Sequence, residues 1–335
     1  MTKISILGAG SWGTALSILL CNNGHKVTVW SVLPDEVEML KQYRQHKDKL
    51  PGAIVPPEVV FTTDLKTCLD QAAVVVFVVP SQTIRETARR IKPFVQKSTI
   101  AVICSKGLEE NTGLRLSEVV QQELGDVRVV ALIGPSHAEE VAAGLPTTVV
   151  AASTDQQAAE TVQDIFMSSR FRVYTSSDII GAELGAALKN IIALCAGISD
   201  GLGYGDNCKA ALMTRGLTEI ARLGKAMGAN TDTFSGLTGM GDLVVTCTSS
   251  HSRNWRAGYL IGQGMPLEKA LTQVKMVVEG VTAAKAAYSL SSKTGVNMPI
   301  VEQACKILFE GKSPAAAVGD LMARSKKNES EDAGW

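Results

Sequence analysis

A lysine at position 189 is the first candidate for chemistry in the chain. It lies in the stretch GAELGAALKNII, and helical spacing places it among small and apolar side chains, those of Gly185, Ala186, Ile192 and Ala193. Burial on such a face disfavours the ammonium form and lowers the pKa of the lysine towards what a general base needs near neutral pH. A lysine that extends its apolar stem out to water fits the same pattern equally well.

Three further stretches carry polar groups next to turns. Lys106 follows the apolar run 100–104, and the stretch GPSHA at 134–138 follows the apolar run 129–133. Ligands of open α/β sheets bind beyond the carboxyl ends of strands, so Lys106 could meet a substrate oxygen or phosphate there, although a solvated loop lysine is an equal alternative. Pro80 and Ser81 occupy the corresponding place after 74–79.

A carboxylate and a basic helix start complete this set. The glycine-rich turn GLTGMGD ends in Asp242, which could bond a substrate hydroxyl or anchor Lys189, while simple connectors have the same composition. Ser252 and Arg253 open a helical stretch, where a hydroxyl, a guanidinium and free helix N–H groups suit a phosphate. An ordinary serine N-cap is the plainer interpretation of the same residues.

The four histidines, at positions 25, 46, 137 and 251, have no metal-ligand spacing, so no metal is expected. His137 lies in a candidate site loop, where a hydrogen-bonding role is open to it.

Glycines near the N-terminus predict a nucleotide site. Gly8, Gly10 and Gly13 are spaced G-x-G-x-x-G between the β-rich run 3–7 and a helical pattern over 14–20. In that context the first glycine permits a tight turn, the second admits a pyrophosphate, and the third lets helix and strand pack closely. The phosphates would sit at the N-terminus of the helix, where free N–H groups favour anions.

The sequence favours NADP, or the use of both nicotinamide cofactors, over NAD alone. An NAD enzyme usually carries an acid at the end of the second strand, for the ribose 2′-hydroxyl. Here the strand 26–30 is followed by Ser31, Val32 and Leu33, without an acid or an arginine. Asp35 and Glu36 are expected in the first turn of the next helix.

Strand and helix patterns alternate from residue 1 to 177 and then give way to helices. This order predicts an α/β fold: a doubly wound Rossmann-type sheet domain over 1–177, followed by an all-α domain over 178–325 and a loose charged tail over 326–335. Val244 and Val245 are the one possible strand in the second half. The expected strands are 3–7, 26–30, 74–79, 99–104, 128–133, 147–152 and 172–174; the expected helices are 14–20, 35–44, 82–91, 114–124, 137–143, 155–167, 178–199, 207–227, 252–262, 280–292, 299–309 and 314–324.

Composition excludes several classes of protein. The 335 residues carry no net charge, so nucleic acid is not an expected partner. Seven cysteines without a C-x-x-C pair indicate a reducing, cytoplasmic compartment. The first strand is expected to begin at residue 3, which leaves no room for a signal peptide. No apolar stretch approaches the roughly 20 residues that span a bilayer, so membrane insertion is not expected.

Seven ordered motifs make the chain similar to a known family, the soluble, bacterial-type NAD(P)-dependent glycerol-3-phosphate dehydrogenases. The resemblance runs from about residue 3 to 325. The motifs are GAGSWGTAL at 8–16, SKGLE at 105–109, GPSHAEEVAAGLPT at 134–147, ELGAALKNIIALCAGISDGLGYGDN at 183–207, GLTGMGDLVVTCTS at 236–249, SRNWRAG at 252–258 and VEGV at 278–281.

The resemblance implies a role for each matching residue. Lys189 would be the catalytic proton acceptor, helped by Lys106 and Asp242, with Asn190 and Thr246 in the active-site group. The glycerol-phosphate site would be lined by Lys106, Gly134, Ser136, Lys189, Asp242, Ser252, Arg253 and Asn254. The dinucleotide would touch Ser11, Trp12, Lys106, Ala138, Arg253, Val277 and Glu279, besides the glycine loop.

The implied reaction is hydride transfer between a nicotinamide and C2 of dihydroxyacetone phosphate or sn-glycerol 3-phosphate. Reduction would supply glycerol 3-phosphate for phospholipid synthesis. Family members often carry basic residues where this chain has Val32 and Leu33, a departure that bears on NADP preference. A homodimer is expected because two-fold assemblies are the commonest.

Two other interpretations use the same architecture. A 3-hydroxyacyl-CoA dehydrogenase would need a catalytic histidine, for which His137 is the candidate, but its GPSHAEE setting fits the phosphate enzyme better. A β-hydroxyacid dehydrogenase also uses a helical lysine, and the SRNW and GMGDL motifs argue against it. A catalytically silent dinucleotide-binding module would be expected to lack Lys189, Asp242 or Arg253, and all three are present.

Overall fold

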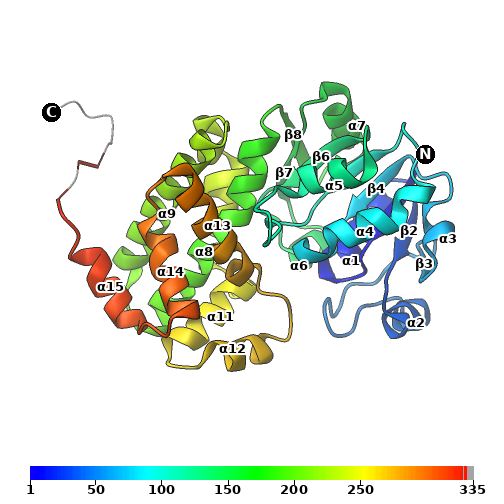
Figure 1. Cartoon of the computed structure of the whole chain (residues 1–335). Helices are drawn as coiled ribbons and strands as arrows, with labels where there is room; N and C mark the ends of the chain where they lie inside the picture. Colours follow the sequence, from blue (N-terminus) through cyan, green and yellow to red (C-terminus); the bar gives the residue numbers. More distant parts are fainter. Residues whose placement is uncertain (327, 330–335) are drawn as a thin grey trace.

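The computed structural model describes residues 1–326, 328 and 329. Most of the tail predicted over 326–335 therefore lies outside the described residues. Figure 1 shows a half in which helices surround a sheet, beside a half built from helices. This arrangement confirms the predicted fold class.

The sheet has eight strands in the described chain, in the order β3-β2-β1-β4-β5-β6-β7-β8. Neighbouring strands run parallel except at the β6–β7 pair, which is antiparallel. The first six strands of the order, from β3 to β6, therefore form the parallel core of a doubly wound sheet. The strands are β1 (Lys3–Leu7), β2 (Lys26–Trp30), β3 (Val60–Thr62), β4 (Val74–Phe77), β5 (Ile100–Ile103), β6 (Arg128–Ile133), β7 (Thr147–Ala152) and β8 (Phe171–Ser176).

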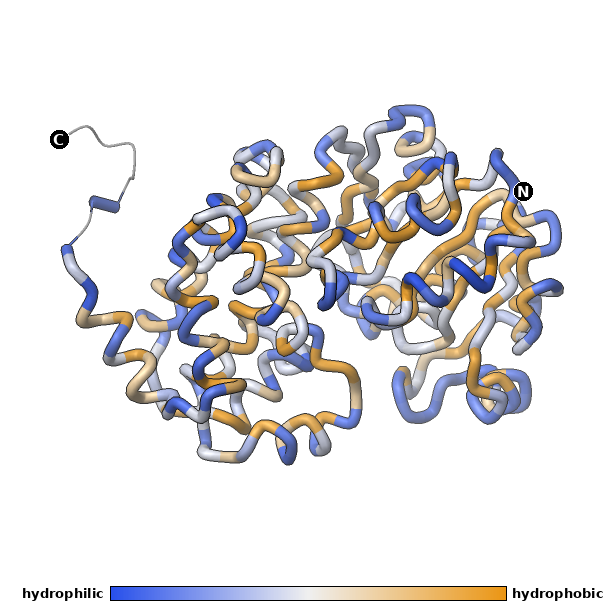
Figure 2. The backbone as a smooth tube through the Cα atoms, viewed as in Figure 1, coloured by the Kyte–Doolittle hydropathy of each residue, from blue (hydrophilic) through white to orange (hydrophobic). Residues whose placement is uncertain are grey.

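Helices cover both faces of the sheet and bury its β-branched strands. Alternate residues of β4 face opposite sides, so that Val76 packs with one core cluster while Val75 and Phe77 pack with the other. The strands are accordingly apolar, and the helices turn their polar sides outward (Figure 2). One face is covered by α1 (Ser11–Asn22), α6 (Ala138–Ala142) and α7 (Gln156–Phe166); the other by α3 (Leu65–Leu69), α4 (Ile84–Ile91) and α5 (Leu116–Leu124).

The chain reverses its direction between β6 and β7. The connection over 134–146 contains the five-residue helix α6. A parallel crossover usually carries a helix long enough to span the sheet, and α6 is too short for that. The chain therefore turns back at the same edge and β7 pairs with β6 in the opposite direction.

The second half of the described chain is helical around one long helix, α8 (Ile179–Gly201). The predicted strand at Val244 and Val245 is wrong, because both residues lie within helix α10. The pattern also missed β3, α3 and α12. The remaining helices are α2 (Pro34–Tyr43), α9 (Asp206–Ala226), α10 (Asp242–Thr248), α11 (Arg253–Gly262), α12 (Leu267–Val274), α13 (Glu279–Thr294), α14 (Pro299–Phe309) and α15 (Pro314–Met322).

One helix, α8, meets the length and composition of a membrane span, which the sequence reading did not anticipate. Its most apolar window is 89% buried inside the structure. A helix at the core of a globular domain is hydrophobic on all sides because every side contacts protein. The helix α8 contacts α9, α10, α11 and α13, and it is the centre of the helical half.

Candidate active site

Loops from three neighbouring strands meet at one edge of the sheet. Ser81 follows β4, Lys106 follows β5 and Gly134 follows β6, and these strands are adjacent in the sheet order. Because the strands are parallel, their carboxyl ends lie together, which is where open α/β sheets bind ligands. The helices α8 and α10 come to this edge from the second half of the chain.

A buried carboxylate, Asp242, joins two lysines from opposite halves of the molecule. The Nζ of Lys189 donates to Asp242 Oδ1 at 2.5 Å, and the Nζ of Lys106 donates to Asp242 Oδ2 at 2.8 Å. Lys189 also donates to Thr246 Oγ1 at 2.6 Å, and Lys106 to the carbonyl of Gly134 at 3.0 Å. The structure thus brings five of the predicted site residues into direct contact.

The environment of Lys189 favours proton exchange near neutral pH. The side chain is 5% exposed, and burial lowers its pKa to about 7 although Asp242 opposes this shift. Burial by itself would raise the pKa of Asp242, but Lys106 and Lys189 outweigh that effect and lower it. Asp242 is thus ionised, while the amine of Lys189 can gain or lose a proton. The snorkelling alternative for Lys189 is ruled out by its burial.

A glycine on α8 lets the carboxylate reach Lys189. A π-helical turn, η4 (Leu237–Gly241), leads into Asp242, the first residue of α10. A Cβ at Gly185 would lie 2.5 Å from the carbonyl oxygen of Thr238, so no larger residue permits this approach of η4 to α8. The stretch GLTGMG is therefore shaped for close packing as well as for a turn.

Amide and hydroxyl side chains fix the start of α11. Asn254 donates from Nδ2 to Asn190 Oδ1 at 2.9 Å, and its Oδ1 accepts from the N–H of Gly280 at 2.8 Å. Ser252 caps the helix by accepting from the N–H of Trp255 at 3.2 Å. The side chains of Ser252 and Asn254 are thus engaged in holding α11 against α8 and α13.

Arg253 and Glu279 lie at the same seam between the two halves. The Nη1 of Arg253 donates to the carbonyl of Val277 at 3.4 Å. Glu279 accepts from the N–H of Ser81 at 3.1 Å and from its Oγ at 2.5 Å, which ties α13 to the loop after β4. Burial raises the pKa of Glu279, although its bonds from Ser81 act in the opposite direction. Ser81 belongs to the site, although the sequence analysis singled out only its place after a strand.

The glycine loop forms an open cradle at the first strand. A Cβ at Gly13 would lie 2.0 Å from the carbonyl oxygen of Gly8, so the helix α1 packs directly on the turn. Among the described residues, a Cβ at Gly10 would meet no atom within 4 Å, and no side chain caps α1. The N–H groups of the first turn are therefore free for phosphate oxygens. Trp12 packs partly buried on the core beside this turn, and Ala138 begins the neighbouring helix α6.

The sequence analysis missed a buried polar cluster at the end of β2. Glu36 accepts from Ser31 Oγ at 2.5 Å, from Lys49 Nζ at 2.6 Å, and bonds His46 Nε2 at 2.9 Å. Burial would raise the pKa of Glu36, but these bonds outweigh it and lower the pKa to about 2. Ser11 Oγ donates to the carbonyl of Lys49 at 2.6 Å, so the cluster adjoins the glycine loop. Only the polar Ser31 at the end of an apolar strand hints at it in the sequence.

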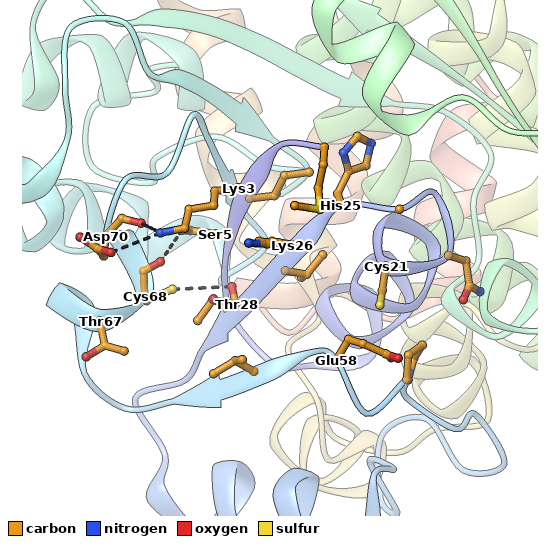
Figure 3. Close-up of a pocket in the computed structure, with 17 residues that line it drawn as sticks. Lys3, Ser5, Cys21, His25, Lys26, Thr28, Glu58, Thr67, Cys68 and Asp70 are labelled. Carbon is orange, nitrogen blue, oxygen red and sulfur yellow. Dashed lines mark hydrogen bonds and ion pairs between the residues drawn. The ribbon is translucent and has the colours of Figure 1, made fainter.

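A groove of about 740 Å³ lies at the other end of the strands (Figure 3). It is lined by the amino ends of β1 and β2, including Lys3, His25 and Lys26. The cation of Lys3 is already paired with Asp70 at 3.3 Å. The two lysines joined by Asp242 lie at the carboxyl edge, so this groove is a separate feature from the candidate active site.

Two family models match the two halves of the chain. The model described as the N-terminus of NAD-dependent glycerol-3-phosphate dehydrogenase matches residues 3–159, and the model described as its C-terminus matches residues 178–319.

Full-length relatives and a solved structure agree with these models. The chain is 52% identical to a protein of Agathobacter rectalis over 335 residues, covering 100% of each chain, and 54% identical to one of Bacillus subtilis, covering 99% of this chain and 97% of the relative. Both relatives are named NAD(P)+ glycerol-3-phosphate dehydrogenase. A crystal structure of glycerol-3-phosphate dehydrogenase from Coxiella burnetii superposes with a TM-score of 0.93 at 40% identity, covering 96% of this chain and 98% of the other.

Proposed function

The chain belongs to the NAD-dependent glycerol-3-phosphate dehydrogenase family, and we propose that the site around Lys189 carries out that family's reaction. The protein is an NAD(P)-dependent oxidoreductase that interconverts dihydroxyacetone phosphate and sn-glycerol 3-phosphate. The observation that carries the proposal for the site is the buried Lys189–Asp242–Lys106 triad, which joins both halves of the molecule.

Lys189 is the proton carrier in this proposal. In oxidation, its neutral amine accepts the proton of the C2 hydroxyl group; in reduction, its ammonium returns a proton to the C2 oxygen. A pKa near 7 makes both forms accessible at neutral pH. Asp242 stabilises the ammonium form and Thr246 fixes the direction of Nζ, while Lys106 offers a second cation to the same oxygen.

The glycine loop fits a dinucleotide, since the space above Gly10 is open and the N–H groups of α1 are uncapped. When bound, the nicotinamide supplies or accepts the hydride. We assign the cofactor to Gly8, Gly10, Gly13, Ser11 and Trp12, with contacts from Lys106, Ala138, Arg253, Val277 and Glu279. Either NAD or NADP serves, as in the named relatives. The substrate is assigned to Lys106, Lys189, Asp242, Gly134, Ser136, Ser252, Arg253 and Asn254, with Asn190 and Thr246 completing the active-site group.

The phosphate of the substrate lies at the start of α11 in this proposal. Arg253 is there, and the first N–H groups of a helix have no intrahelical acceptors. Because the bonds of Asn254 and Ser252 hold α11 in place, these two residues orient the phosphate site and bind through the backbone. Binding energy from the phosphate fixes C2 for the transfer.

The wider role is a proposal as well. Residues 1–177 form the dinucleotide domain and 178–325 the substrate domain, with the reaction taking place between them. The enzyme acts in the cytoplasm as a homodimer, without membrane insertion or nucleic acid, and its product supplies phospholipid synthesis.

Oxidation of NADH and NADPH, followed at 340 nm, tests the proposal. We expect the enzyme to reduce dihydroxyacetone phosphate and to leave unphosphorylated dihydroxyacetone almost untouched. Lys189→Ala should lower kcat by about two to four orders of magnitude, the range for a lost general acid–base group. Folded wild-type protein without activity on the phosphate ester would refute the reaction. Near-normal turnover by Lys189→Ala would remove that residue from the proton transfer.

A further inference from the structure

His137 presents a buried nitrogen that no described residue satisfies. It precedes α6, in the loop that follows β6. Its Nε2 is buried and has no hydrogen-bond partner within the described part of the chain. A buried polar atom without a partner is costly, and most such atoms in native proteins bond to protein, water or a ligand. The atom is therefore available to bond a ligand or a water molecule.

The ring of His137 lies at the seam between the two halves. It faces the ring of His251, in the loop before α11, with the centroids 5.7 Å apart and the planes at 51°. The residues next to these two histidines, Ser136 and Ser252, are both assigned to the substrate. His137 thus belongs to the loop whose Gly134 carbonyl accepts from Lys106, and its ring contacts the loop that leads into α11 at Arg253.

The charges around His137 favour an anion over a cation. Burial lowers its pKa, and so do the cations of Lys189 and Lys106, while Glu139 and Glu140 on α6 act in the opposite direction. The exposed ring of His251 is the remaining titratable group against it. The imidazole is therefore neutral near pH 7, with one N–H to donate.

A donor from the loop after β6 would complement those at the start of α11. Ser252 Oγ accepts from Trp255 N–H, and the amide of Asn254 is bonded to Asn190 and Gly280, so both side chains also hold α11 in place. Arg253 keeps most of its N–H groups uncommitted to the protein. A phosphate dianion offers three strong acceptor oxygens, which donors from two segments of the chain can share.

We propose that His137 is a substrate-binding residue whose Nε2–H donates to a phosphate oxygen of dihydroxyacetone phosphate or glycerol 3-phosphate. This inference rests on the proposed function, since it concerns the substrate of the same site. The phosphate would then bridge the loop after β6 and the start of α11, and it would draw the two halves together. Its negative charge stabilises the imidazolium, so substrate binding raises the pKa of His137 and takes up a proton.

Steady-state kinetics with paired variants tests the inference. His137→Phe keeps the ring contact with His251 and removes the donor, while His137→Gln keeps an N–H. Hydrogen bonds to charged groups correspond to roughly 10- to 100-fold in binding. We expect His137→Phe to raise KM for dihydroxyacetone phosphate by about that factor, with kcat and KM for NADH within about threefold, and His137→Gln to recover most of the loss. The matched control, His251→Phe, should behave as wild type.

Several outcomes would overturn the role of His137. A KM for His137→Phe within about twofold of wild type would do so, and so would a loss of the same factor in the residual kcat/KM for unphosphorylated dihydroxyacetone. These results leave the proposed function standing if wild type reduces the phosphate ester. Failure of wild type itself would refute the proposed function instead.

A titration of the wild-type enzyme covers the case in which His137→Phe does not fold. In the NMR spectrum of histidine-labelled enzyme, sn-glycerol 3-phosphate should raise the pKa of one imidazole, and glycerol should not. The responding resonance should be missing from the His137→Gln spectrum. An unchanged pKa for that resonance would refute the contact.

Discussion

Removing the charge of Asp242 tests how the site sets the protonation of Lys189. The carboxylate contacts Nζ of Lys189 at 2.5 Å and Nζ of Lys106 at 2.8 Å, and it is 1% exposed. Asp242→Asn keeps the shape of the side chain but leaves both lysines without their counter-charge. Because Lys106 still repels a second cation, the neutral form of Lys189 should become dominant.

The size of the effect follows from two opposing causes. Burial lowers the pKa of Lys189 to about 7 in spite of the carboxylate, which acts to raise it. An opposite charge at this distance is worth about 1–3 pKa units, so its loss should bring the pKa to roughly 4–6. At pH 7 the ammonium fraction would then drop from about half to below about a tenth. Leaving a buried charge without its partner lowers the free energy of unfolding by about 3–5 kcal/mol, but Lys189 avoids part of this loss by giving up its proton.

The assay is the pH dependence of kcat/KM in both directions between about pH 3.5 and 9, a range that includes the shifted limbs. In wild type we expect oxidation of glycerol 3-phosphate to rise and reduction of dihydroxyacetone phosphate to fall as the pH passes 7. In Asp242→Asn both limbs should move down by about 1–3 pH units. Asp320→Asn, which removes the exposed partner of Lys312, is the matched control and should leave the profile unchanged. Limbs that stay near pH 7 in folded Asp242→Asn would refute this account of the site.

Two further substitutions probe the phosphate contact and the helical core. Arg253→Ala should raise KM for the phosphate ester by about 10- to 100-fold with a smaller effect on kcat; an unchanged KM would mean that the phosphate binds elsewhere. Burial raises the pKa of Glu219 to about 7, although its carboxylate accepts from the N–H of Ile300 at 2.9 Å. The protonated carboxyl of Glu219 therefore contributes its full stability below about pH 4.3, and this contribution is lost as the pH rises through 7. The free energy of unfolding in urea should thus fall by a few kcal/mol from pH 5 to 8, and less in Glu219→Gln; equal falls in both proteins would contradict this assignment.

Much of the fold could be predicted because most of its strands are buried runs of β-branched residues. The run 74–79 predicted β4, and the helical spacing around Lys189 predicted α8. Elements whose stability comes from tertiary contacts were missed. The three-residue strand β3 and the five-residue helix α3 are too short to show a period. Val244 and Val245 resemble a strand by propensity, but packing against α8 makes them helical.

The candidate site was predictable in its residue types and less so in its contacts. The sequence singled out Lys189 and Asp242 but left open whether they meet, which depends on the approach of η4 to α8 at Gly185. The cluster of Glu36, His46 and Lys49 was out of reach, because its members contribute to no periodic pattern. Glu36 does lie in the first turn of α2, as predicted, yet its carboxylate turns inward to Ser31.

Because β7 reverses direction, the length of α8 before Lys189 determines where the amine of that lysine lies. Because β8 runs parallel to β7, it ends at the edge of the sheet away from the two lysines, and α8 starts there at Ile179. Ten residues separate the start of α8 from Lys189, which at 1.5 Å each carry the amine about 15 Å back towards the reacting edge. One residue added or removed in that interval would displace Nζ and rotate it by about 100°, away from Asp242. The number of residues between the start of α8 and Lys189 is therefore as important to the site as the identity of the lysine itself.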